Sequence, residues 1–178
     1  MQKLLHQLLV IGWLLLPSSS INAQNLSLDF DGVDDAVDTN LGASEISANP
    51  SGFTFEMWFR STDQSASPLS CPDGMRTLTR LTAQNFNFEL AACNGDLYVS
   101  EFYGTFAPPI QAIGPVVVNQ WQHVRIDYDG TGFSIYLDCA LVHSSANTIS
   151  NRRTSIHLGE YGVITFVNQP RHWLGQID

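Results

Sequence analysis

Five aspartates fall within ten residues near the start of the chain, and their types and spacing suggest a metal site. They are Asp29, Asp31, Asp34, Asp35 and Asp38. Calcium prefers oxygen ligands and takes about six to eight of them from carboxylates, loop carbonyls and water. The pattern is not an EF-hand, because the glycine comes too early and the twelfth position lacks a glutamate. The alternative is an Asp-rich turn whose side chains bond their own backbone.

A second group of residues could bind sugar rings by stacking. Its members are Tyr98, Tyr103, Phe106 and Tyr161. The first three crowd a segment that ends in two prolines, and the fourth lies in a glycine-rich stretch. Aromatic side chains on loops often have a binding function. The alternative is packing, because strand alternation would place several of them inside a sheet sandwich.

The elements that must position these residues all read as β-strands. After Trp121, Val124, Ile126 and Tyr128 alternate with polar residues, and the alternation resumes after an Asp-Gly turn at Asp129. A period of two with two-residue turns indicates antiparallel hairpins that are buried on one face. Similar runs recur along the chain, and no segment keeps a helical period. The sequence predicts an all-β fold, a two-sheet antiparallel sandwich.

The first 23 residues predict a signal peptide. Lys3 precedes an apolar run at residues 4–16, and Ala23 supplies a small residue at the cleavage point. The alternative, an uncleaved anchor, conflicts with the short apolar run, since about 20 residues are needed to span a bilayer. We therefore expect one mature domain at residues 24–178, secreted or on the cell surface, with no membrane insertion after cleavage.

The net charge of the mature chain narrows the classes of possible binding partner. The only lysine leaves with the signal peptide, so seven arginines face 17 acidic residues, a net charge of −10. A domain this acidic repels nucleic acid and anionic membranes.

Cysteines in an oxidising compartment can pair. A hairpin turn between the strands after Cys71 and before Cys93 favours the Cys71–Cys93 disulfide, although counting allows all three pairings. Cys139 would then be free or available to another chain.

Four stretches resemble a known family. They are L-D-F-D-G-V-D-D-A-V at residues 28–37, F-T-F-E-M-W-F at 53–59, W-Q-H-V with its Asp-Gly turn at 121–130, and W-L-G-Q-I-D at 173–178. They are similar to the LamG-like jelly-roll family (laminin G type 3-like) of the concanavalin A-like lectin/glucanase superfamily. The resemblance implies a jelly roll and an extracellular recognition module. The family usually continues into one more strand, so we expect this jelly roll to lack its last strand.

The resemblance also bears on the metal site. Some members of the family bind calcium, which implies Asp31, Asp34 and Asp35 as ligands, with the closing Asp178 nearby. Cys139 departs from the family, which usually has glycine in an Asp-Gly turn at this point. Because glycine is favoured there for its positive φ, the cysteine predicts a different turn type or a role outside the fold. The alternative is an ordinary turn with a tolerated thiol.

The sequence favours binding over catalysis. The superfamily's glucanases carry an E-x-D-x-x-E or E-x-D-x-E strand, because retaining glycosidases need two carboxyl groups about 5–5.5 Å apart, and no such pattern occurs here. We predict a non-catalytic module that binds carbohydrate; the alternative partner is an extracellular protein in adhesion or scaffolding. Glycoside hydrolysis is the least favoured of these three functions. Trp58, Trp121 and Trp173 read as core or sheet-supporting residues and His123 as structural, and His143, His157 and His172 show no zinc spacing.

Overall fold

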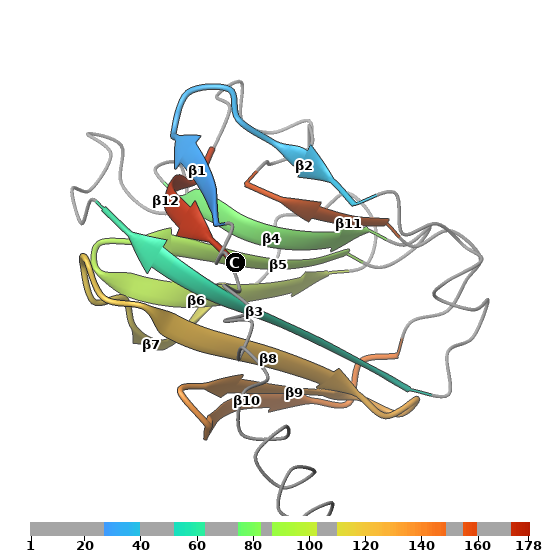
Figure 1. The fold of residues 1–178 in the computed structure, drawn as a ribbon. Helices are drawn as coiled ribbons and strands as arrows, with labels where there is room; N and C mark the ends of the chain where they lie inside the picture. Colours follow the sequence, from blue (N-terminus) through green and yellow to red (C-terminus); the bar gives the residue numbers. More distant parts are fainter. Residues whose placement is uncertain are drawn as a thin grey trace, which may run out of the picture.

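The protein folds as two antiparallel β-sheets packed face to face (Figure 1). The computed structural model describes residues 27–39, 52–62, 75–82, 87–102, 110–148, 155–159 and 172–178. In spatial order, the first sheet contains β1 (Leu28–Asp31), β12 (Leu174–Ile177), β3 (Phe53–Ser61), β8 (Gln122–Tyr128), β9 (Phe133–Leu137) and β10 (Ala140–Ser145). The second contains β2 (Val37–Asp38), β11 (Ser155–Leu158), β4 (Arg76–Thr82), β5 (Asn87–Cys93), β6 (Asp96–Phe102) and β7 (Ile110–Pro115).

This architecture confirms the predicted all-β sandwich. Alternation sets the inner face of each strand: in β8 every second residue from Val124 is buried, and β9 repeats the pattern from Phe133. Trp173 is fully buried and lies edge-on to Phe59, with ring centroids 5.8 Å apart. Each such side chain contributes about 1.5–3 kcal/mol by leaving water. Within the described ranges, no helix has the length and apolar character to cross a membrane.

The predicted Asp-Gly turn between β8 and β9 is present. Asp129 Oδ1 accepts hydrogen bonds from Thr131 Oγ1 at 2.7 Å, Thr131 N at 2.8 Å and Gly132 N at 3.0 Å. The Thr131 hydroxyl, followed by the backbone amides, lowers the pKa of the Asp129 carboxyl. Gly130 takes a φ of 90°, which only glycine adopts without strain. The side chain of Asp129 therefore closes the turn.

Two of the three cysteines, Cys93 and Cys139, lie among the described residues. Cys93 is buried in a small second cluster with Met75, Ala91 and Tyr98, and Cys139 is an exposed free thiol. Cys71 lies outside the described residues, as does the signal peptide at residues 1–23, so both the Cys71–Cys93 pairing and the cleavage stay predictions.

Of the alternatives for Cys139, the ordinary turn with a free thiol is the one observed, and the expectation of a different turn type is wrong. Asp138 and Cys139 both have positive φ, 48° and 69°, in the two-residue turn between β9 and β10. Two-residue hairpins favour such mirror-image turns because their twist matches that of the strands. The hairpin therefore imposes the backbone conformation, and the cysteine adopts it although glycine would do so at lower cost.

Replacing Cys139 by glycine should stabilise the domain. A non-glycine residue in the left-handed region costs about 1–2 kcal/mol, so we expect the unfolding temperature to rise by about 2–8 °C for a domain of this size. Calorimetry on monomeric protein without reductant, which leaves a Cys71–Cys93 disulfide intact, measures the shift. Cys139→Ser is the control, because serine removes the thiol and keeps the strain. An equal rise in both variants would assign the effect to the thiol.

Candidate functional site

The acidic turn joins the outermost strand of one sheet to the outermost strand of the other, since it links β1 to β2 (Figure 1). Asp31 N donates to Asp35 Oδ2 at 2.7 Å, and Val33 N donates to Asp31 Oδ1 at 2.8 Å. Gly32 provides the positive φ, 79°, that the reversal needs. The alternative drawn from the sequence, aspartates bonding their own backbone, is therefore part of the observed geometry.

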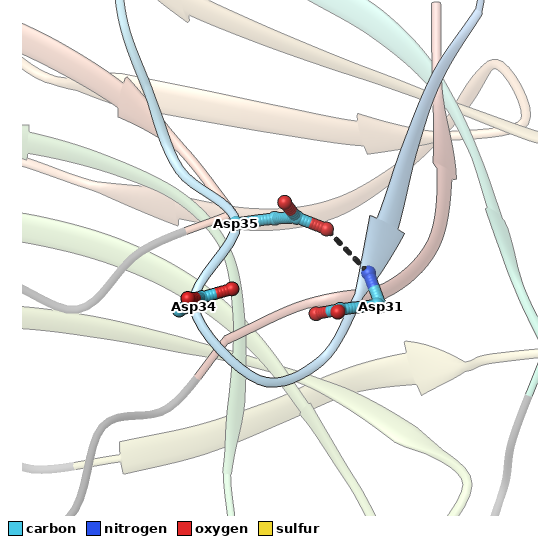
Figure 2. A group of neighbouring side chains, drawn as sticks. All are labelled: Asp31, Asp34 and Asp35. Atoms are coloured by element: carbon cyan, nitrogen blue, oxygen red, sulfur yellow. Dashed lines mark hydrogen bonds between the residues drawn. The ribbon is translucent and has the colours of Figure 1, made fainter.

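The same turn gathers three carboxylates. Asp31, Asp34 and Asp35 each contribute an oxygen, and these oxygens all lie within 4.8 Å of one another (Figure 2). Calcium binds oxygen at about 2.3–2.6 Å, so two ligands of one ion lie at most about 5 Å apart. The spacing therefore fits a single calcium ion. The side chains are exposed or half-buried, which leaves the remaining coordination positions open to water.

The side chains of Arg76 and His172 hold two backbone carbonyls of the acidic turn. Arg76 Nη1 donates to Gly32 O at 3.5 Å and to His172 O at 3.2 Å. His172 Nδ1 lies 3.1 Å from Asp35 O, so this nitrogen must carry the proton that the carbonyl accepts. Two of the turn's carbonyls are thus engaged by the protein. A bound ion would depend on the three carboxylates, other carbonyls and water.

Asp178 falls outside this cluster, which corrects the expectation that it lies nearby. Strand β12 runs antiparallel to β1, with Leu28 beside Ile177 and Asp31 beside Leu174. The end of β12 therefore lies at the start of β1, away from the turn. Asp178 instead extends the ladder with β3: its N–H donates to Trp58 O, and Trp58 N donates to its carbonyl, both at 2.9 Å.

Of the four aromatic candidates, Tyr98 alone lies among the described residues. Tyr98 is half-buried and packs against Met75, Ala91 and Cys93, which favours the packing alternative for this residue. Tyr103, Phe106 and Tyr161 lie outside the described residues and stay candidates.

The outer face of the second sheet carries buried polar residues that the sequence pattern did not indicate. Arg80, Glu89 and Ser100 occupy neighbouring positions across β4, β5 and β6, and all three are buried. Thr77 Oγ1 donates to Glu89 Oε1 at 2.6 Å. Alternation gave no signal for them, because it assigned this face to solvent. Their burial means that they require partners within the protein.

Two of the three tryptophans expected in the core or in support of a sheet are exposed, so the core alternative is wrong for them. Trp58 keeps 49% and Trp121 keeps 41% of its surface in contact with water, whereas Trp173 is buried as predicted. The register explains the error: Met57 and Phe59 occupy the inner face of β3, so Trp58 must point outward. Alternation already contained this signal, and only the hydrophobic character of tryptophan argued against it.

His123 is a neighbour of Trp58, in agreement with a structural role. It sits directly across from Trp58 in the β3–β8 ladder, and the two rings are 4.9 Å apart at their centroids. Its Nε2 lies 3.6 Å from the exposed Glu56 carboxylate. The histidine therefore supports one side of the exposed indole.

Solved structures with the same fold have very different sequences. The LG1-3 region of the laminin alpha2 chain matches with a TM-score of 0.56 and 14% identity, over 85% of this chain and 30% of that chain. A native heptameric SAP-like pentraxin from Limulus polyphemus matches with a TM-score of 0.53 and 12% identity, over 85% of this chain and 72% of that one. At such identities the likeness concerns the fold. No curated protein sequence matches the chain.

A family model, however, covers most of the sequence. It matches residues 31–178, which include the acidic turn, both exposed tryptophans and the closing strand. The match agrees with the two six-stranded sheets described above. The chain is therefore a member of the laminin G type 3 family, within the concanavalin A-like lectin/glucanase superfamily.

Proposed function

We propose that this protein is a secreted or cell-surface recognition module that binds carbohydrate without catalysis and holds a calcium ion in its acidic turn. Membership of a superfamily described as lectins and glucanases supports the sugar class. The observation that carries the calcium proposal is the convergence of the Asp31, Asp34 and Asp35 carboxylates within 4.8 Å. The acidic surface suits neutral ligands and cations.

The carboxylates support binding more than hydrolysis. Glu89 is buried with a hydroxyl donor, Glu101 is held by side chains of another strand, and Glu56 is exposed. A retaining glycosidase needs one carboxylic acid and one nucleophilic carboxylate about 5–5.5 Å apart in a site that the substrate can enter. The converging carboxylates of the acidic turn instead share one exposed loop, a setting suited to a cation.

The three aspartates would hold the ion, and the ion in turn would stabilise the turn that joins β1 to β2. Asp31 and Asp35 also accept backbone hydrogen bonds, so their carboxylates are already oriented before any ion binds. Arg76 and His172 hold the turn from the other side, which limits the reorganisation that binding requires. Preorganisation of this kind favours affinity.

Millimolar calcium should raise the thermal stability of the protein relative to chelator. At about 100 times its dissociation constant, an ion that binds only the folded state adds about 2.7 kcal/mol, or about 5–10 °C for a domain of this size. Asp34→Asn should abolish the shift. Asp96→Asn, which changes the same charge outside the cluster, should retain it. An unchanged unfolding temperature in the wild type would remove the calcium proposal.

A glycan array with and without calcium tests the carbohydrate proposal on a sample whose folding circular dichroism has confirmed. Binding to one glycan class would support the module, and its loss in chelator would connect the acidic turn to recognition. A folded protein that binds no glycan in either condition would contradict the carbohydrate proposal. The adhesion alternative, a protein partner, would then take its place.

A further inference from the structure

We propose that Trp58 and Trp121, on the outer face of the first sheet, form the surface that contacts the sugar rings of a neutral glycan. This inference rests on the proposed carbohydrate recognition and assigns it a site distinct from the acidic turn. Together with Ser27 and Asp178, the two tryptophans line one open depression of about 300 Å³. That volume lies at the lower end of small-ligand sites, which span about 300–1,000 Å³.

Strand register brings these side chains together. In the β3–β8 ladder Phe59 pairs with Gln122, so Trp121 follows on the same outward face, diagonal to Trp58. On the other side of Trp58, Asp178 forms the reciprocal backbone hydrogen bonds at 2.9 Å. Trp58 therefore lies within a strand, and the other three lining residues directly adjoin the ends of β1, β8 and β12. Strands hold side chains more rigidly than loops do.

The segment that carries Trp121 is also fixed. The buried Gln122 side chain accepts from Val117 N at 2.8 Å and donates to Pro115 O at 3.0 Å. Asn119 N donates to Ser61 O at 2.8 Å, which ties the same segment to the end of β3. The His123 ring lies beside Trp58 at 4.9 Å between ring centroids. The Trp58 indole and the backbone that carries Trp121 are thus held before a ligand arrives, which lowers the entropy cost of binding.

The chemistry of the depression suits a neutral sugar. The apolar C–H face of a sugar ring can cover an indole and release the water held against it. The sugar hydroxyls need acceptors, and the carboxylates of Asp178 and Glu56 flank Trp58. These two carboxylates outnumber the guanidinium of Arg60, which shares this part of the face, so the site favours a neutral glycan over an anionic one. A stable protein interface buries about 800 Å² on each partner, whereas the exposed aromatic surface here consists of two side chains.

The test compares Trp58→Ala, Trp121→Ala and the double variant with the wild type by isothermal titration calorimetry. The probes are soluble β-glucan, xylan and galactomannan, each in calcium and in chelator, with heparin as the polyanion. We expect about a tenfold loss of affinity for each single variant and no detectable binding for the double variant. The binding of the neutral probe should also change the intrinsic tryptophan fluorescence of the wild type.

Two controls separate stacking from general damage. Tyr136→Ala removes an aromatic residue from the same outer face, where it packs under Arg125 with a guanidinium-to-centroid distance of 4.3 Å, and should leave affinity unchanged. Trp58→Phe keeps an aromatic face and should recover most of the affinity. Since both indoles are exposed, unfolding temperatures should stay close to that of the wild type.

The outcomes distinguish this site from the wider function. If the wild type binds a neutral glycan and the double variant binds it equally well, the site assignment is wrong and carbohydrate recognition stands. If the wild type binds heparin alone, the neutral ligand class is wrong. If it binds none of the probes, carbohydrate recognition and this site are overturned together.

Discussion

Gly175→Ala should leave little folded protein. A Cβ at this position would lie 2.0 Å from Arg60 O on the neighbouring strand, and the residue has a φ of 142°. The backbone oxygen cannot move without separating β12 from β3, which pair through Gly175 and Ser61. We expect a loss of more than about 4 kcal/mol, against a total stability of about 5–15 kcal/mol.

Urea unfolding and the yield of soluble protein measure this effect, and Gly114→Ala is the matched control. At Gly114 the added Cβ would meet the end of the Leu137 side chain at 2.8 Å, which can change its rotamer. We expect the control to lose about 1–2 kcal/mol and to fold. A Gly175→Ala variant as stable as the control would contradict the close approach of β12 and β3.

The stability of β12 has consequences for both candidate sites. Strand β12 lies between β1 and β3, so it positions Asp178 beside Trp58 at one end and Leu174 beside Asp31 at the other. A variant that loosens this strand should weaken calcium binding and glycan binding together. The aspartate and tryptophan variants should instead affect one site each, which makes Gly175 useful for recognising general damage.

Glu101→Ala should cost about 3–5 kcal/mol, the range expected when one partner of a buried polar pair is removed. Glu101 lies on β6 in the second sheet, and its side chain contacts β10 and the segment after it in the first sheet. Its Oε1 lies 2.9 Å from His143 Nε2, and its Oε2 accepts from Ser145 Oγ at 2.6 Å and Asn147 Nδ2 at 2.5 Å. Only 7% of its side-chain surface is exposed.

A bulge in β10 creates this contact. The register shifts between Leu141 and His143, so His143 pairs with Ile135 and Ser145 with Phe133, both of which face the core. Bulges re-aim side chains in this way. The side chains of His143 and Ser145 therefore point inward, toward Glu101. Glu101 follows Leu97 and Val99 on the inner face of β6. The network joins the two sheets at the edge opposite to the acidic turn.

Chemical denaturation at neutral pH measures the cost, with Glu56→Ala as the control. Glu56 also lies near a histidine, at 3.6 Å from His123, but 61% of its side chain is exposed. Exposed pairs contribute about 0–1 kcal/mol, so the control should be almost neutral. Equal losses in the two variants would show that the Glu101 network does not hold the sheets together.

Features that depend on local residue patterns could be predicted before the fold was known. Alternation identified the inner faces of β3, β8 and β9, because a strand exposes its two faces at a period of two whatever it packs against. The Asp129 turn was predictable for the same reason, since its hydrogen bonds span two and three residues. Asp31, Asp34 and Asp35 converge because they share one short turn.

Features that depend on strand register and on packing between the sheets could not be predicted from residue patterns. Asp178 could be placed only once β12 was known to run antiparallel to β1, which puts it beside Trp58. Glu101 and His143 are 42 residues apart, and they come into contact because of a bulge in β10 that no residue pattern predicts. Trp58 was misassigned because its apolar ring outweighed its outward position in the alternation. Hydrophobic character is a property of one residue, whereas exposure is a property of what the neighbouring strands leave uncovered.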